Sequence, residues 1–166
     1  MSGIIGVISD THGLMRPEAI AALQNSTTII HAGDIGSEAV LRALEKIAPV
    51  YAVRGNNDTT EWAAGIPSEM RLTVAGILIH IVHDIAEFHP QPETAVRVVI
   101  TGHSHRPSIE ERDGILYINP GSAGPRRFRL PISVARLDIR DQRPIATVLQ
   151  LDCATSGSDG KGKRKM

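Results

Sequence analysis

Three successive units, each a short apolar strand followed by a polar loop, fill the first 58 residues and constrain the fold most. The strands are predicted at residues 3–9, 28–30 and 50–53, which are rich in isoleucine and valine. Helices with apolar residues at helical spacing follow the first two loops and begin near Pro17 and Ser37. This order predicts a parallel α/β arrangement, in which the loops gather at the carboxyl ends of the strands and form one shared site.

The second half of the chain changes to strands separated by short turns. Only residues 94–97 suggest a helix there. Further strands are predicted at residues 70–74, 77–82, 98–100, 115–118, 133–139 and 146–151. We therefore expect a second, mostly antiparallel sheet that packs on the first.

The length and composition fit one domain with a basic tail. A chain of 166 residues with 42% hydrophobic content is long enough to bury a single core. We assign residues 1–152 to this domain and predict that residues 153–166 are disordered, because residues 156–165 have no apolar side chain to bury. The tail has four cationic residues and one aspartate, so the rest of this neutral chain carries a charge of about −3.

The charge and the scarcity of aromatic residues argue against several classes of partner. Bulk nucleic acid needs a clustered basic face, and aromatic residues, at 3%, leave few platforms for stacking bases. The first residues lack the features of a signal peptide, and the longest apolar stretch, residues 76–82, is too short to span a bilayer. The single cysteine, Cys153, excludes an internal disulfide, and we expect a cytoplasmic protein with no membrane partner.

Seven polar residues fall just after predicted strands and form the candidate metal site. All are oxygen or imidazole donors and none is a thiolate, a set that suits hard to borderline divalent metals. In each of the two short pairs, Asp10-x-His12 and His103-x-His105, we expect an extended loop to point both side chains the same way. The seven candidates are Asp10, His12, Asp34, Asn56, His83, His103 and His105.

Two divalent ions at one site need a bridging ligand, because cations about 3.5 to 4 Å apart repel each other. Asp34 lies in a Gly-Asp loop between the other candidates and is the predicted bridge. Manganese is the first expectation for the ions, and nickel, zinc, iron and magnesium are also compatible with these donors.

The order of these motifs resembles that of the calcineurin-like metallophosphoesterase superfamily. The motifs are Asp10-x-His12, Gly33-Asp34, Gly55-Asn56, His83 and Gly102-His-Ser-His105. The short chain, the Gly-Asn-x-Asp loop of residues 55–58 and Asn119-Pro-Gly-Ser122 are similar to the compact YfcE-like phosphodiesterases of bacteria and archaea. The resemblance implies an α/β (α+β) fold of four layers, α-β-β-α, in which two mixed sheets are flanked by helices.

The same resemblance implies how the site works. One metal would be held by Asp10, His12, Asp34 and His105, and the second by Asp34, Asn56, His83 and His103. A hydroxide bridging the two ions would attack a phosphate ester, most often a diester, in line with the leaving group. Catalytic roles are expected for His12, Asp34 and Asn56. Contacts to a small phosphoester or nucleotide substrate are expected for Asn56, Asn57, Ser122 and Arg126.

Two positions depart from the family pattern. Asn57 stands where many superfamily members have a histidine proposed to protonate the leaving group, and an amide cannot supply that proton. Asp84 follows His83 where glycine is usual, and it either orients a ligand histidine or faces solvent. The remaining histidines are expected to serve packing or to face solvent, and they are His31, His80 and His89.

Two other functions fit the same fold. One is a non-catalytic scaffold that has lost part of the metal set, and the complete set of candidate ligands argues against it. The other is a regulatory module that binds nucleotides, which weak turnover with tight nucleotide binding would favour. The sequence is compatible with a homo-oligomer.

Overall fold

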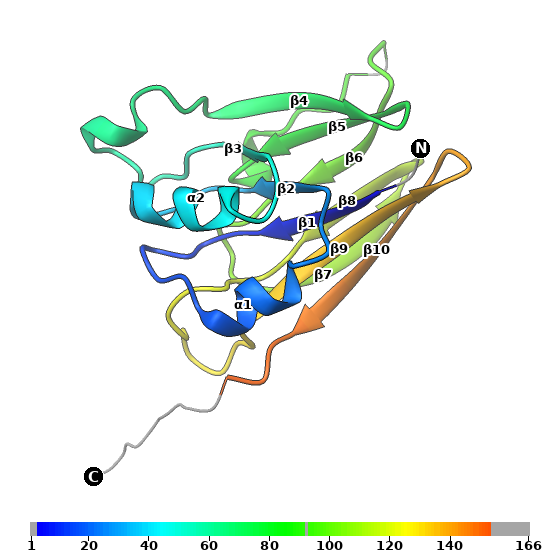
Figure 1. Ribbon diagram of the computed structural model, residues 1–166. Helices are drawn as coiled ribbons and strands as arrows, with labels where there is room; N and C mark the ends of the chain where they lie inside the picture. The colour runs from blue at the N-terminus through cyan, green and yellow to red at the C-terminus, as the bar shows by residue number, and fades with distance from the viewer. Residues whose placement is uncertain (1–2, 92, 154–166) are drawn as a thin grey trace, which may run out of the picture.

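The described residues form two five-stranded sheets (Figure 1). The computed structural model describes residues 3–91 and 93–153. In the first sheet the strand order is β10-β9-β1-β2-β3. Its strands are β1 (Ile4–Ile8), β2 (Thr28–His31), β3 (Val50–Ala52), β9 (Ser133–Arg140) and β10 (Arg143–Gln150).

The second sheet has the order β4-β5-β6-β8-β7. It is mixed, because β5, β6 and β8 run parallel while β4 and β7 pair antiparallel with β5 and β8. The first sheet is mixed as well. Its strands β1, β2 and β3 are parallel, and β9 pairs antiparallel with both β1 and β10. The strands of the second sheet are β4 (Glu69–Val74), β5 (Ile77–Val82), β6 (Val96–Ile100), β7 (Ser108–Arg112) and β8 (Ile115–Asn119).

The main core lies between the two sheets, and strand β1 shows how the sequence builds it. Successive side chains of a strand point to opposite faces, so Ile5 and Val7 join the core between the sheets while Ile8 packs toward the helices. Ile79 and Ile81 of β5 belong to the same core as Ile5 and Val7. Burying one such aliphatic side chain contributes about 1.5 to 3 kcal/mol.

Two α-helices, α1 (Pro17–Ala22) and α2 (Glu38–Glu45), cover the outer face of the first sheet (Figure 1). Helix α2 buries Val40 and Leu44, which lie one turn apart on the same face. A 3₁₀ helix, η2 (Ile85–Glu87), follows β5, and the residue after it, Phe88, packs on the second sheet. The centroid of the Phe88 ring lies 5.0 Å from that of His80 and 6.2 Å from that of Tyr117. The expectation of two mixed sheets flanked by helices is therefore confirmed.

Three expectations about the second half were wrong. The second sheet is not mostly antiparallel, because the connections from β5 to β6 and from β6 to β8 join parallel neighbours. Strands β9 and β10 extend the first sheet, because β9 pairs with β1. Residues 94–97 form no helix, because residues 96 and 97 already belong to β6. In addition, β7 escaped prediction because all five of its residues are exposed and lack an apolar face.

The structure does not test the prediction of a disordered tail. Residues 154–166, which make up nearly all of the predicted tail, lie outside the described residues. Within residues 3–91 and 93–153, no helix is both long and apolar enough to cross a bilayer. A second 3₁₀ helix, η1 (Glu61–Ala63), completes the regular elements of the described chain.

Candidate metal centre

The candidate ligands all lie in loops at the carboxyl ends of parallel strands. Five strands from the two sheets end at this edge, so their loops meet there (Figure 1). The loops after β1, β2, β3, β5 and β6 carry, in that order, Asp10 with His12, Asp34, Asn56, His83, and His103 with His105.

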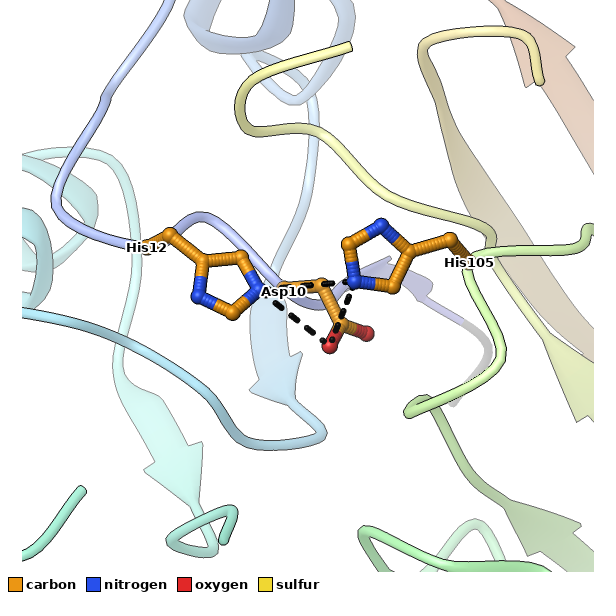
Figure 2. A group of neighbouring side chains, drawn as sticks. All are labelled: Asp10, His12 and His105. Carbon is orange, nitrogen blue, oxygen red and sulfur yellow. Dashed lines mark hydrogen bonds and ion pairs between the residues drawn. The ribbon is translucent and has the colours of Figure 1, made fainter. Parts of the chain in front are cut away.

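One group of potential ligands consists of Asp10, His12 and His105, which converge as Figure 2 shows. The Asp10 Oδ1 atom lies 3.8 Å from His12 Nε2 and 3.4 Å from His105 Nε2. The two imidazole Nε2 atoms are 3.4 Å apart. Three donor atoms this close together can reach a single ion placed between them.

A second group consists of Asp10, Asp34 and His83, and it shares Asp10 with the first. His83 Nε2 lies 3.3 Å from Asp34 Oδ2 and 3.8 Å from Asp10 Oδ1. Asp34 Oδ2 also lies 3.8 Å from His12 Nε2, a residue of the first group. Both carboxylates thus reach histidines of the two groups, so Asp10 joins Asp34 as a candidate bridge.

The reason predicted for the convergence of these side chains was wrong. The loops are not extended, because Asp10, His12 and Asp34 have φ angles of 56°, 48° and 54°, and those of His103 and His105 are 71° and 64°. This left-handed region is uncommon outside glycine, although aspartate, asparagine and histidine tolerate it better than other residues. As a result His105 joins the first group, whereas the His103 ring packs edge-on against His83.

Asn56 and His103 occupy the more exposed side of the site. Asn56 is exposed, and the His103 side chain is 46% exposed. Both border a cavity of about 160 Å³ that opens beside His83. The other residues that line this cavity are Arg54, Gly55, Ser68, Asp84 and Glu87. His103 does not belong to either of the two groups of potential ligands.

The donor atoms at the centre fit divalent ions. Asp10 Oδ1, His83 Nε2 and His105 Nδ1 are buried and have no hydrogen-bond partner among the described residues, which is costly unless something else binds them. His83 Nδ1 lies 2.7 Å from the Ala32 carbonyl, to which it donates. This bond assigns the ring proton to Nδ1 and leaves the Nε2 lone pair free for a metal.

Hydrogen bonds from Asn57 stabilise the negative charge of the Asp34 carboxylate. The Asn57 backbone N–H donates to Asp34 Oδ1 at 2.9 Å, and its side-chain amide donates to Oδ2 at 3.0 Å. Burial opposes ionisation of Asp34, but the contacts with His83 and Asn57 outweigh it and hold the Asp34 pKa well below its usual range. Asn57 therefore binds directly to Asp34, the predicted bridging ligand.

Asp58 lies in the same polar loop as Asn56, and the sequence pattern indicated no role for it. Its carboxylate is 4% exposed and accepts hydrogen bonds from the backbone N–H groups of Ile35, Gly36 and Gly55 at 2.9 to 3.0 Å. Ile35 and Gly36 follow Asp34 in the sequence, and Gly55 directly precedes Asn56. Asp58 thus ties the loop after β2 to the loop after β3.

His31 links the loops after β1 and β2 from behind the metal centre. Its Nδ1 accepts a hydrogen bond from Gly33 N–H, so the proton lies on Nε2, which donates to Thr11 Oγ1 at 3.0 Å. Thr11 Oγ1 in turn donates to the Ile35 carbonyl at 2.7 Å. Complete burial lowers the pKa of His31 to about 4 and keeps the ring neutral. The expectation of a packing role is confirmed, and the buried histidine also orders two ligand loops.

The Asn119-Pro-Gly-Ser122 motif forms a tight turn that holds other loops. Asn119 donates to the Gly102 carbonyl at 2.9 Å and accepts from Gly121 N–H at 2.9 Å. Ser122 is 2% exposed, and its hydroxyl donates to the Asp10 carbonyl at 2.9 Å. Arg126 is exposed and donates to the Leu130 carbonyl at 3.3 Å. Their expected contacts to substrate remain proposals.

Asp84 combines the two alternatives considered for it. Its Oδ1 accepts a hydrogen bond from Ala86 N–H at 3.0 Å and so caps η2. Its Oδ2 lies 3.8 Å from His103 Nε2, while 36% of the side chain is exposed. The carboxylate is therefore placed to influence His103 and is also in contact with solvent.

The comparisons with known proteins agree with this geometry. Residues 4–142 match the model of the calcineurin-like phosphoesterase superfamily domain. A probable metallophosphoesterase of Methanothermobacter thermautotrophicus is 34% identical over 151 residues, which cover 81% of this chain and 86% of that protein. A phosphodiesterase of Methanocaldococcus jannaschii is 33% identical over 140 residues, which cover 70% of this chain and 82% of that protein.

A solved structure shows the breadth of the fold. Vps29 of Chaetomium thermophilum superposes with a TM-score of 0.72 at 19% identity, covering 89% of this chain and 96% of that protein. At this identity the likeness concerns the fold alone. The family match, which spans most of the chain, and the two archaeal relatives lead to a narrower conclusion: this chain belongs to the calcineurin-like phosphoesterase superfamily.

Proposed function

We propose that this phosphoesterase is a phosphodiesterase that depends on two divalent metal ions. The observation that carries the proposal is that Asp10 Oδ1 and His83 Nε2, two of three buried side-chain atoms without a hydrogen-bond partner among the described residues, each lie in a ligand group. The two groups share Asp10, as adjacent ions with a common carboxylate require. The phosphodiesterase of M. jannaschii adds support for diesters as the substrate class.

The residues have distinct tasks in this proposal. Asp10, His12, Asp34, Asn56, His83, His103 and His105 would hold the ions, with Asp34 and Asp10 shared between them. Bound divalent ions supply an activated water as the nucleophile and neutralise charge on the phosphoryl oxygens. Manganese is the metal proposed, and the cytoplasm is the proposed compartment. The exposed amide of Asn56 borders the cavity beside His83 and is placed to donate to a phosphoryl oxygen.

The surroundings of Asn57 support a preference for esters with stable leaving groups. The Asn57 side chain donates to Asp34 Oδ2, and an amide has no proton to transfer to a departing oxygen. General-acid assistance typically contributes about 10² to 10⁴ in rate, and it matters least when the leaving oxyanion is already stable. Diesters and aryl esters are therefore the proposed substrates, ahead of alkyl monoesters.

The test is an activity screen of the purified protein with Mn²⁺, Ni²⁺, Zn²⁺, Fe²⁺ and Mg²⁺. Each metal is combined with bis-p-nitrophenyl phosphate, p-nitrophenyl phosphate and an alkyl monoester, and bound metal is counted by mass spectrometry. We expect two ions per chain and the highest kcat/KM on the diester. Tight nucleotide binding with no turnover of any ester would instead support a regulatory module.

A further inference from the structure

We propose that the loop of residues 124–130 binds a single-stranded oligonucleotide whose phosphodiester enters the metal centre. This inference rests on the proposed phosphodiesterase function and names its substrate class. The loop begins next to the Asp10 loop and carries the sequence Gly-Pro-Arg-Arg-Phe-Arg-Leu. The residue before the loop, Ala123, donates its backbone N–H to the Ser9 carbonyl, next to Asp10.

The loop concentrates positive charge in a chain whose domain is otherwise mildly acidic. Arg126, Arg127 and Arg129 lie within four residues, and the sequence has no acidic residue between Asp113 and Asp138. All three are exposed, and the arginine ion pairs within the described residues are made by others, Arg42, Arg112 and Arg140. Their charge is available for the phosphates of a ligand.

Phe128 gives the loop a stacking surface. Its exposure is 86%, whereas the next most exposed large hydrophobic residue of the described chain, Ile145, is 50% exposed. Its φ angle of 54° lies in the left-handed region, which is strained for a bulky residue. An exposed aromatic ring between arginines is the combination that binds unpaired bases and their phosphates in single strands.

The base of the loop is fixed to the metal-binding loop after β1. Ala123 N–H donates to the Ser9 carbonyl at 3.0 Å, and Arg16 Nη2 donates to the Gly124 carbonyl at 3.2 Å. From Gly124 the chain can extend at most about 14 Å to Phe128. In the proposal, a strand with one phosphodiester at the metal centre places its neighbouring nucleotides against this loop.

The experiment measures binding of a fluorescein-labelled six-nucleotide strand, as DNA and as RNA of the same sequence, by anisotropy at several salt concentrations. The double variant Arg127→Gln/Arg129→Gln should lower the slope of log K against log salt by about 1.4, since each phosphate contact to a single strand contributes about 0.7. Phe128→Ala should weaken binding at least about 5-fold with the slope unchanged. The DNA and RNA arms identify which strand is preferred.

The matched control is Arg97→Gln/Arg143→Gln, which removes the same charge near the turn of Asp141 and Gln142, at the opposite end of the sheets. An equal loss of affinity in this control would overturn the proposal, because binding would then reflect diffuse charge. The proposal would also be overturned if Phe128→Ala changed the molecular mass measured by light scattering but left the affinity for the oligonucleotide unchanged. The loop would then be a contact between copies of this chain.

Failure of this inference is distinguishable from failure of the proposed function. Wild-type protein that does not hydrolyse bis-p-nitrophenyl phosphate with any metal contradicts the proposed function. Wild-type protein that hydrolyses this diester but binds the oligonucleotides no better than the loop variants contradicts only the inference about the loop. Circular dichroism of each variant serves as the control for retention of the fold.

Discussion

The metal centre has a buried half and an exposed half, and the two are held in different ways. In the buried half, Asp10, Asp34, His83 and His105 are each at most 4% exposed. In the exposed half, Asn56 is exposed, and the side chains of His12 and His103 are 22% and 46% exposed. Both halves come from loops at the same edge of the sheets, so burial rather than position in the fold separates them.

The difference lies in the residues behind each ligand. His83 is fixed by the Ala32 carbonyl, and Asp34 is fixed by two hydrogen bonds from Asn57. The His103 ring packs edge-on against His83, and the charged group beside its Nε2 is the partly exposed Asp84 carboxylate at 3.8 Å. Outer partners of this kind orient a ligand and strengthen metal binding. The buried half should therefore determine whether metals bind, and the exposed half should adjust how tightly they bind.

The largest effect is expected for Asp10→Asn, which removes the carboxylate shared by both ligand groups. We predict that kcat/KM on bis-p-nitrophenyl phosphate at saturating Mn²⁺ falls by more than about 100-fold. Loss of a residue that only orients a metal ligand typically lowers activity by about 10- to 100-fold. The matched control is Asp138→Asn on β9. A variant that still binds two ions and keeps a tenth of the activity would place Asp10 outside the centre.

The second prediction concerns His31 and pH. In the unfolded chain this histidine takes up a proton near its ordinary pKa of 6.5, whereas the buried ring has a pKa of about 4. Stability is therefore lost as pH falls below 6.5, and the loss reaches about 3 kcal/mol below pH 4. In urea unfolding of metal-free protein, His31→Gln should lose less stability on acidification than wild type. Equal pH dependence in His31→Gln and in the exposed control His89→Gln would contradict this role.

The third prediction concerns Asp58, which supports the buried half. Asp58→Asn places an amide against three backbone N–H donors, so some of them lose their acceptor. The free energy of unfolding should fall by about 2 kcal/mol, and kcat/KM should fall about 10-fold because Asp34 is less well held. Asp113→Asn, in an exposed turn, is the matched control. Unchanged stability in Asp58→Asn would show that these loops are held without it.

The smallest effect is expected for His103→Asn in the exposed half. The Mn²⁺ concentration needed for half-maximal activity should rise about 10-fold, and added Mn²⁺ should restore most of the rate. His89→Asn serves as the control. If His103→Asn loses as much activity as Asp10→Asn and excess metal does not restore it, the division into two halves is wrong.

The position of the site could be predicted from the sequence, because strand and loop order determines which loops meet at the edge of a sheet. Asp10, Asp34 and His83 come from three such loops and lie within reach of one another. The direction of the side chains could not be predicted. Asp10 and His12 converge through a left-handed backbone, which local polarity patterns do not reveal.

The supporting residues were the least predictable part. Asp58 accepts hydrogen bonds from the backbone N–H groups of Ile35 and Gly36 in another loop, and His31 bonds the Thr11 hydroxyl of the loop after β1. Such contacts exist only after the chain has folded. The pairing of β9 with β1 was missed for a related reason, since an alternating strand pattern does not specify its neighbour. One signal was available for Asp58, because it belongs to a dense polar run that ends the third unit.

The left-handed backbone at the ligand positions has a consequence for how such a centre can change in evolution. Asparagine adopts this conformation about as readily as aspartate or histidine. A single substitution such as Asp10→Asn or Asp34→Asn can therefore replace a charged metal ligand with a weaker neutral one while the loop keeps its path. Descendants of a chain like this one can lose catalysis stepwise, retain the fold for another use, and regain the ligand by the reverse substitution.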